Sequence, residues 1–257
     1  MQVLLTLAYD GTRYAGWQRQ ENATAVQQVL EEALTRVLKP SIVLDDFSSR
    51  IVTVAAGRTD AGVHALGQRV GFFIDELLIP LDKLPQVLNG ALPPDIAVQK
   101  AEQVSDDFHP RFHPRMKTYM YRFYNAPAPN PLLARYSTFV PRLLDVSAMQ
   151  KAAGHFIGRH DFIAFCAAGG SAKTTVREVY ACKVSCETTP GSKNINLTVT
   201  GNAFLYNMVR IIAGTVLYAG LGKIKPDDVP GIIKGRDRTK AGKTMPPEGL
   251  VLVGVEY

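Results

Sequence analysis

The segment AAGRTDAGVHALGQ, residues 55–68, places one carboxylate, Asp60, between Arg58 and His64 on a stretch broken up by glycines. An aspartate in such a segment is most often a turn residue that hydrogen-bonds its own backbone. A neighbouring guanidinium lowers the pKa of a carboxylate, and an ionised carboxylate can act as a nucleophile or a base. Both interpretations of Asp60 stay open from these residues alone, whereas His64 is predicted to be a hydrogen-bonded scaffold residue.

Other patterns that could bind a metal or a nucleotide are weak in this sequence. His109 and His113 are four residues apart, which suits metal binding on a helix, but each is followed by a proline, which disfavours helix. The sequence has no P-loop, no dinucleotide-binding glycine motif and no nucleophile elbow. We therefore expect neither a metal ion nor a bound cofactor such as ATP or NAD.

The three cysteines are Cys166, Cys182 and Cys186. Their odd number and the absence of a CxxC pair argue against a disulfide framework or a thiolate zinc site. We expect buried or half-buried thiols in a reducing cytosol. The N-terminal segment MQVLLTLAYDG predicts a strand rather than a signal peptide, and no apolar run approaches the roughly 20 residues of a membrane span. These features predict a cytoplasmic protein.

Positive charge is concentrated in two stretches of a chain whose net charge is +6 and whose pI is about 9.2. Residues 108–125 interleave four basic residues with aromatic residues and contain no acid, and residues 223–243 hold seven basic residues and three acids. Basic and aromatic side chains together suit a surface that neutralises phosphates and stacks bases. The first stretch is equally typical of an ordinary strand whose aromatic side chains face a core.

Periodicity predicts alternating strands and helices. Strands are expected over residues 3–9, 68–74, 119–125, 174–187, 194–201 and 249–257, with a further strand ending near Ala56. Helices are expected over residues 26–38, 145–157 and 205–220, the first with a capping box formed by Thr24 and Gln27. This order predicts mixed sheets that carry helices on one face.

At 257 residues, 46% of them hydrophobic and 20% charged, the chain has the size and composition of one large or two small globular domains. The two halves show similar patterns of strands around a helix. The Pro-rich segment APAPNP, residues 126–131, lies between them and is predicted as a linker region.

The segment GRTDAGVHA, residues 57–65, resembles the hallmark of the tRNA pseudouridine synthase A family. Six further blocks resemble that family in the same order along nearly the whole chain. They are YDGTRYAGWQRQ (9–20), TAVQQVLEEAL (24–34), DFHPRFHPRMKTYMYRFYN (107–125), GRHDFIAF (158–165), GNAFLYNMVR (201–210) and MPPEGLVLVGVEY (245–257). The chain departs from the usual family pattern at Pro114 and Met245, neither of which is a main site position.

The resemblance implies a role for five residues. Asp60 matches the catalytic aspartate, Tyr119 the tyrosine that stacks on the substrate base, and Arg210 the arginine beside the catalytic carboxylate. Arg58 matches the arginine that contacts RNA around the flipped base, and Leu250 matches an apolar position near the site.

The family resemblance also implies a fold and a set of partners. The fold is two related, RRM-like α/β domains, residues 1–108 and 109–257, with mixed, largely antiparallel strands that share an extended sheet and a basic cleft between them. The implied enzyme is an isomerase that works as a homodimer without cofactor or metal. Its implied substrate is the tRNA anticodon stem-loop, at positions 38–40.

Conversion of uridine to pseudouridine breaks the N1–C1′ bond and rejoins the base through C5, so it needs no redox cofactor. The base must leave the stack to be reached. An ionised Asp60 then attacks C1′ or removes a proton, and these two routes stay open. A glycosidase would need a pair of acids, and a non-catalytic RNA-binding module would have no need of Asp60.

Overall fold

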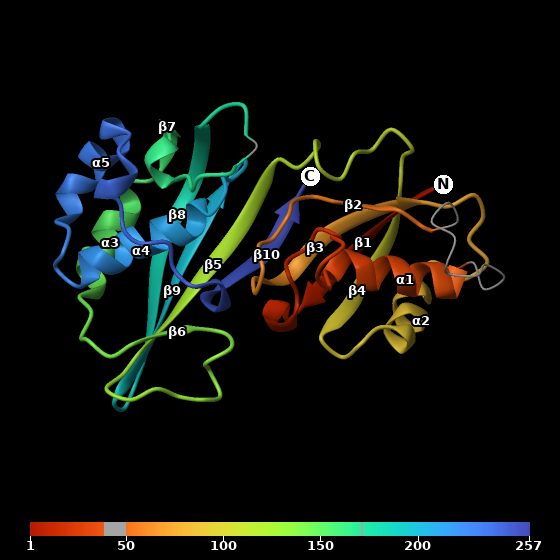
Figure 1. Ribbon diagram of the computed structural model, residues 1–257, viewed down its shortest axis with the longest axis horizontal. Coiled ribbons are helices and arrows are strands. Elements are labelled where there is room, and N and C mark those ends of the chain that lie inside the picture. The colour runs from red at the N-terminus through yellow and green to blue at the C-terminus, as the bar shows by residue number, and fades with distance from the viewer. Residues whose placement is uncertain (39–49, 171) are drawn as a thin grey trace. The chain divides into compact units, whose positions relative to one another are not determined.

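The computed structural model describes residues 1–38, 50–170 and 172–257 (Figure 1). These residues form two compact units. The first unit is Met1–Arg115 together with Leu252–Tyr257, and the second is Met116–Val251. The division therefore falls after Arg115 instead of after residue 108, and the last residues of the chain return to the first unit. Residues 126–131, predicted as a linker region, lie inside the second unit.

The first unit is built on a sheet in which β1 (Gln2–Tyr9) lies between β3 (His64–Phe73) and β4 (Ile96–Val104), antiparallel to both. The short strand β2 (Thr53–Ala55) pairs antiparallel with β3. Most residues of β1 are buried, as expected for a central strand. Sequence periodicity predicted β1, β2 and β3, and β3 begins four residues earlier than expected, at His64.

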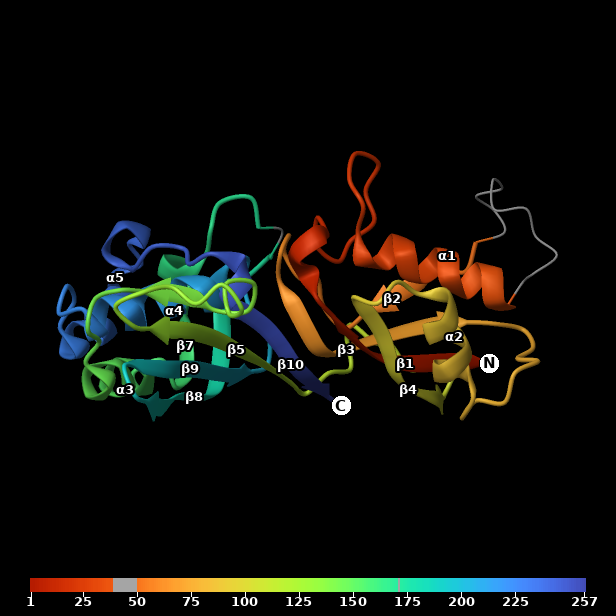
Figure 2. The same ribbon diagram turned by 90° about the horizontal axis from the view of Figure 1, so that it is seen from below.

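Helices α1 (Val26–Leu38) and α2 (Leu84–Ala91) belong to the same unit, and Figure 2 shows α1 running along one face of its strands. The buried residues of α1 include Val26, Leu30 and Leu34, which recur at helical spacing. The predicted capping box is wrong. The backbone N–H groups of Val26 and Gln27 donate to the carbonyl oxygens of Gly16 and Trp17, because the preceding loop folds back over the start of the helix.

The second unit is built on β5 (Met116–Asn125), β9 (Ser192–Gly201), β8 (Val176–Thr189) and β7 (Gly158–Asp161), paired antiparallel in that order. The short strand β6 (Thr138–Val140) is parallel to β5. The hairpin between β8 and β9 turns at Gly191, whose φ of +79° is the left-handed conformation that glycine adopts readily. The strand β10 (Leu250–Glu256) ends the chain.

Three α-helices complete the second unit: α3 (Val146–Gly154), α4 (Met208–Gly220) and α5 (Val229–Gly235). Helix α3 begins at Asp145, whose carboxylate accepts the backbone N–H of Ala148 at 3.0 Å. Helices α3 and α4 pack together, α3 against β8 and α4 against β5. Gly220 makes this contact close, because a Cβ there would lie 2.6 Å from Met149 Cγ. Short 3₁₀ turns cover Gly11–Arg13, Ile163–Phe165, Pro226–Asp228, Arg238–Lys240 and Pro247–Gly249.

The predicted fold class is confirmed, since each unit combines α-helices with largely antiparallel strands, and the parallel pair β5–β6 makes the strand arrangement mixed. The sequence patterns did not predict α2, α5, β4, β6 or β7. Among the residues described here, no helix is long and apolar enough to cross a bilayer. The three cysteines are free, but the expectation of buried or half-buried thiols is wrong for Cys186, which is exposed near the hairpin end of β8.

Candidate active site

Asp60 lies on the connection from β2 to β3 in the first unit, and its side chain is half-buried. Arg58 is exposed, whereas Thr59 between them is buried. The connection leaves the sheet in a fixed direction, because the N–H of Ala56 donates to the carbonyl of Arg69 on β3 at 2.8 Å.

Residues 11–17 fold directly against the Asp60 segment. The N–H of Trp17 donates to the carbonyl of Thr59 at 3.0 Å, and the N–H of Gly62 donates to the carbonyl of Tyr14 at 3.2 Å. Gly16 has a φ of +90°, and a Cβ there would lie 2.6 Å from the Thr59 carbonyl oxygen. Backbone meets backbone at this point, and only glycine allows that approach. The 9–20 block thus supports the segment that carries Asp60.

His64 holds the end of the same segment, as predicted. Its imidazole is buried, and Nδ1 accepts the N–H of Gly11 at 3.0 Å. The Asp10 carboxylate lies 3.2 Å from the same nitrogen. Because a ring nitrogen that accepts the Gly11 N–H cannot also donate to Asp10, we assign Nδ1 as an acceptor and treat Asp10 as a polar neighbour. His64 thereby ties the start of β3 to the turn that follows β1.

Tyr119 lies on β5 in the second unit, opposite Val199 of β9. Its side chain is 9% exposed, and its ring meets Phe204 edge to face, with ring centroids 5.3 Å apart. Tyr121 and Phe123 follow on the same face and are fully buried. Tyr121 and Phe123 therefore belong to the core of the second unit, whereas Tyr119 keeps a small exposed fraction of its surface.

Arg210 lies in the first turn of α4 and is held at its guanidinium. Its Nε donates to the carbonyl of Met245 at 2.6 Å, and its Nη1 donates to Asn207 Oδ1, also at 2.6 Å. Asn207 has a φ of 59°, a left-handed conformation that asparagine tolerates better than most residues. The N–H of Met245 in turn donates to the carbonyl of Arg210 at 3.2 Å. The direction of the guanidinium is thus set by short, charge-assisted bonds.

The segment 242–250 is packed against both α4 and β5. Gly242 and Gly214 of α4 meet backbone to backbone, since a Cβ on Gly214 would overlap the carbonyl oxygen of Lys243. The Tyr121 hydroxyl donates to the carbonyl of Pro246 at 2.8 Å, and burial raises its pKa. Leu250, at the start of β10, is buried beside these contacts. Arg210 and Leu250 are therefore joined within one well-packed region of the second unit.

The two histidines with metal-like spacing have other partners. His113 Nδ1 accepts the N–H of His109 at 3.2 Å, and His109 Nδ1 accepts the N–H of Arg111 at 3.1 Å. Within the described ranges, no group of three or more histidine, cysteine, aspartate or glutamate side chains is arranged to hold a metal ion.

Comparison with known proteins identifies the family. A family model described as tRNA pseudouridine synthase matches residues 6–113 and 152–257. A curated relative named tRNA pseudouridine synthase A from Ruminiclostridium cellulolyticum is 45% identical over 256 residues, which cover 100% of this chain and 99% of that protein. Relatives with the same name from Caldicellulosiruptor bescii and Bacillus pumilus are 46% and 42% identical, covering 99% and 100% of this chain and 99% of each relative. This chain belongs to the tRNA pseudouridine synthase family.

Enzymes of this family are isomerases that convert uridine to pseudouridine. The two matched ranges contain Arg58, Asp60, Arg210 and Leu250, whereas Tyr119 falls between them. The full-length relatives span the Tyr119 region as well. Asp60 and Arg58 belong to the first unit, and Tyr119, Arg210 and Leu250 belong to the second.

Sequence reasoning missed the residues that hold these side chains. Asn207 falls inside the helix predicted over residues 205–220, whereas α4 begins one residue after it. Asparagine is a known signal of a helix start, and that signal could have located the boundary. Met245 was noted only as a departure from the family pattern. Its backbone N–H and carbonyl, not its side chain, bond Arg210. A backbone role of this kind is compatible with a different residue at that position.

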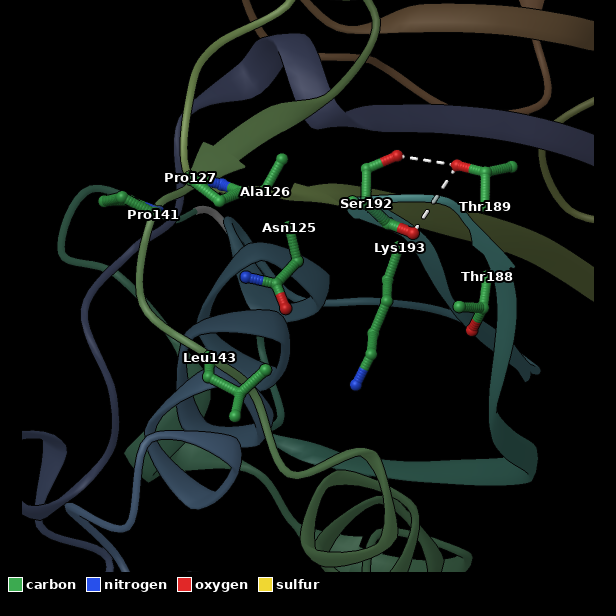
Figure 3. Close-up of a pocket in the computed structure, with 10 residues that line it drawn as sticks. Asn125, Ala126, Pro127, Pro141, Leu143, Thr188, Thr189, Ser192 and Lys193 are labelled. Atoms are coloured by element: carbon green, nitrogen blue, oxygen red, sulfur yellow. Dashed lines mark hydrogen bonds between the residues drawn. The ribbon is translucent and has the colours of Figure 1, made fainter.

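A pocket of about 340 Å³ lies elsewhere in the second unit (Figure 3). Its walls come from the ends of β5 and β6 and from the β8–β9 hairpin, and they include Leu143, Pro127 and Lys193. None of the five predicted site residues lines it. Its size is near the lower limit for small-molecule sites, but its location does not connect it with the residues that the family resemblance selects.

Proposed function

We propose that this protein converts uridine to pseudouridine at positions 38–40 of the tRNA anticodon stem-loop, with Asp60 as the catalytic carboxylate. Family membership supports the reaction. The observation that carries the role of Asp60 is its setting, a half-buried carboxylate on a segment whose neighbouring residues are bonded to β3 and to residues 11–17. A simple turn aspartate would need no such support from distant parts of the chain.

In the proposed reaction the target uridine first leaves the RNA stack, at a cost of a few kcal/mol. The exposed guanidinium of Arg58 contacts the RNA around the vacated position. The ring of Tyr119 stacks on the displaced uracil and recovers about 1–3 kcal/mol. Leu250 provides an apolar wall near the base.

The chemical step is an isomerisation with two open routes. In the first, Asp60 attacks C1′ as the N1–C1′ bond breaks, and the Asp60–C1′ bond breaks in turn when C5 bonds C1′. In the second, Asp60 removes a proton from the sugar as the N1–C1′ bond breaks, and returns it to the sugar when the C1′–C5 bond forms. In both routes the uracil turns before C5 bonds C1′, the proton on C5 is lost and N1 gains a proton. The Tyr119 hydroxyl assists the proton transfer at C5. Arg210 keeps the Asp60 carboxylate ionised and orients it, a role for which a guanidinium held by Asn207 and Met245 is suited.

The proposal extends to partners and compartment. A net charge of +6 favours binding to the phosphates of tRNA. The protein acts as a homodimer, as the family resemblance implies. It works in the cytoplasm, and its three free cysteines accord with a reducing compartment. A monomeric mass by light scattering at micromolar protein concentration would contradict the dimer.

Release of tritium from tRNA that carries [5-³H]uridine tests the proposed reaction, because the C5 proton is lost only when the new bond forms. The wild-type protein should release tritium. Asp60→Asn should bind tRNA with unchanged affinity but release tritium about 10³-fold more slowly, or not at all. Asn keeps the shape of the side chain and removes its charge.

Two outcomes favour other functions. If wild-type protein binds tRNA and releases no tritium, the protein is an RNA-binding module. If free uracil appears without pseudouridine, the protein is a glycosidase. Activity of Asp60→Asn within tenfold of wild type would exclude Asp60 as the catalytic carboxylate.

A further inference from the structure

A buried polar cluster lies beneath the segment that carries Asp60. It consists of Tyr9 at the end of β1, Thr59 on the segment, and Gln68 on β3, all three with less than a tenth of their surface exposed. Burial of polar groups is unfavourable unless they are paired. Apolar side chains could have made a purely structural contact between β1, β3 and this segment. The polar side chains at this place therefore indicate a further role.

Tyr9 and Gln68 each hydrogen-bond one atom of the segment that carries Asp60. The Tyr9 hydroxyl and Thr59 Oγ1 are 2.8 Å apart and hydrogen-bonded. Gln68 Nε2 donates to the carbonyl of Gly57 at 2.8 Å. The cluster therefore hydrogen-bonds the chain at Gly57 and Thr59. These residues flank Arg58, and Thr59 immediately precedes Asp60.

Thr59 is also held by a hydrogen bond from Trp17. The N–H of Trp17 donates to the Thr59 carbonyl at 3.0 Å, and the Trp17 ring packs on Tyr9 with ring centroids 6.2 Å apart. Burial raises the pKa of Tyr9 to about 12. The phenol is therefore protonated throughout the neutral range, and its hydrogen bonds persist wherever the enzyme works.

We propose that Tyr9 and Gln68 are positioning residues for Asp60, which fix the backbone at Gly57 and Thr59 so that the carboxylate is held at one place. The inference rests on the proposed function, in which Asp60 is the catalytic carboxylate. Hydrogen bonds suit this task better than apolar packing, because their direction and length are narrowly defined. A displacement of about 1 Å at a reacting group lowers a rate by about 10²-fold.

The first test is Tyr9→Phe, which removes one hydroxyl and keeps the ring against Trp17. We expect the single-turnover rate to fall by about tenfold or more and the dissociation constant for tRNA to stay the same. Hydrogen exchange of the backbone amides of residues 56–63 should become faster. Thr59→Val should act in the same way, and Thr59→Ser, which keeps the hydroxyl, should restore the rate.

Tyr257→Phe is the matched control in the same unit. The Tyr257 hydroxyl donates to the carbonyl of Pro110 at 2.9 Å and does not touch the Asp60 segment. This variant also loses one hydrogen bond made by a half-buried tyrosine, so its melting temperature should fall by a similar few degrees. Its single-turnover rate and the amide exchange of residues 56–63 should match wild type.

The outcomes separate this inference from the proposed function. If Asp60→Asn is inactive while Tyr9→Phe and Thr59→Val react at the wild-type rate, the positioning role is overturned and the proposed function stands. If Asp60→Asn retains activity, the proposed function fails, and positioning of a catalytic Asp60 fails with it. Unchanged amide exchange at residues 56–63 in Tyr9→Phe overturns the positioning role whatever the activity, as does an equal loss of rate in Tyr257→Phe.

Discussion

In the second unit, Arg210 is held at its reacting end, where Nε donates to the Met245 carbonyl and Nη1 donates to Asn207 Oδ1, each at 2.6 Å. In the first unit, several bonds hold the backbone beside Asp60: Gln68 binds Gly57, and Tyr9 and Trp17 bind Thr59. The cation is oriented through its own charged group. The carboxylate is placed through the backbone around it.

This difference follows from the two proposed tasks. An arginine that orients a carboxylate has several N–H donors, so some can bind the scaffold while others face the partner. For a nucleophile or base, bonds to the backbone on either side fix the place at which its carboxylate meets the substrate. Substitutions should therefore affect the two regions in different ways.

The largest effect after loss of Asp60 should appear at Tyr119, and it would show that the second unit also contributes a reacting group. Tyr119→Phe should lower the single-turnover rate by about 10²–10⁴-fold, the usual contribution of general acid–base help, with unchanged tRNA affinity. Tyr119→Ala should also weaken tRNA binding, because the stacking ring is removed. A wild-type rate for Tyr119→Phe would exclude a catalytic hydroxyl, and a markedly lower melting temperature of Tyr119→Ala would assign the ring to the core.

Arg210→Lys tests whether the guanidinium must be held at two points. A lysine keeps the charge but cannot bond Asn207 and Met245 in the same fork. Loss of charge-assisted bonds worth about 1.5–3 kcal/mol should lower the single-turnover rate by about 10–10²-fold. Arg238→Lys is the control, since that guanidinium also bonds two acceptors, the Gly242 carbonyl and Thr244 Oγ1, within the 238–244 turn. Equal rate losses in the two variants would indicate a general effect on folding.

Asn207→Gly separates the side-chain acceptor from the backbone conformation. Glycine adopts the φ of 59° without strain, so the variant removes only the acceptor for Arg210. The rate should fall by about tenfold, as expected for loss of one bond worth roughly 1–1.5 kcal/mol, and the melting temperature should change little. Asn207→Ala should show the same rate and a lower melting temperature. A wild-type rate in both variants would mean that the Asn207 side chain does not orient Arg210.

The smallest effect on rate should come from Tyr121→Phe. The Tyr121 hydroxyl bonds Thr138 Oγ1 at 2.6 Å and the Pro246 carbonyl at 2.8 Å. Its loss leaves a buried acceptor unpaired and should destabilise the protein by about 1–3 kcal/mol. Thermal unfolding should show this, whereas the single-turnover rate should stay within a few-fold of wild type. A rate loss as large as that of Tyr119→Phe would refute the distinction between the two tyrosines.

Much of the fold follows from local periodicity. The central strands β1, β5 and β9 and the helices α1, α3 and α4 are long and have buried positions at regular spacing. The missed elements lack that signal. Strand β4 reads IAVQKAEQV and buries only Ile96 and Val98, so its second half has the composition of a polar loop. Helix α2 is eight residues long and contains both a proline and a glycine.

The candidate site divides in the same way. Asp60 and Arg58 were recognisable because they stand in a short segment of unusual composition, and Tyr119, Arg210 and Leu250 because they stand in family blocks. The supporting atoms were not predictable. Thr59 meets Tyr9 across 50 positions of sequence, and the partner of Arg210 at Met245 is a backbone carbonyl, which every residue possesses. Such contacts depend on tertiary structure and leave no local pattern.

The meeting of Gly214 with Gly242 has a consequence for how this enzyme can vary. The main chain of α4 touches the main chain of the 242–250 segment there, and Thr215 Oγ1 accepts the N–H of Gly242 at 2.8 Å. The distance between the helix that carries Arg210 and the segment that carries Leu250 is therefore set by contact between backbone atoms, and not by the volume of side chains. Apolar residues around this contact can be exchanged during evolution or design without changing that distance. One methyl group at either glycine would force the helix and the segment apart.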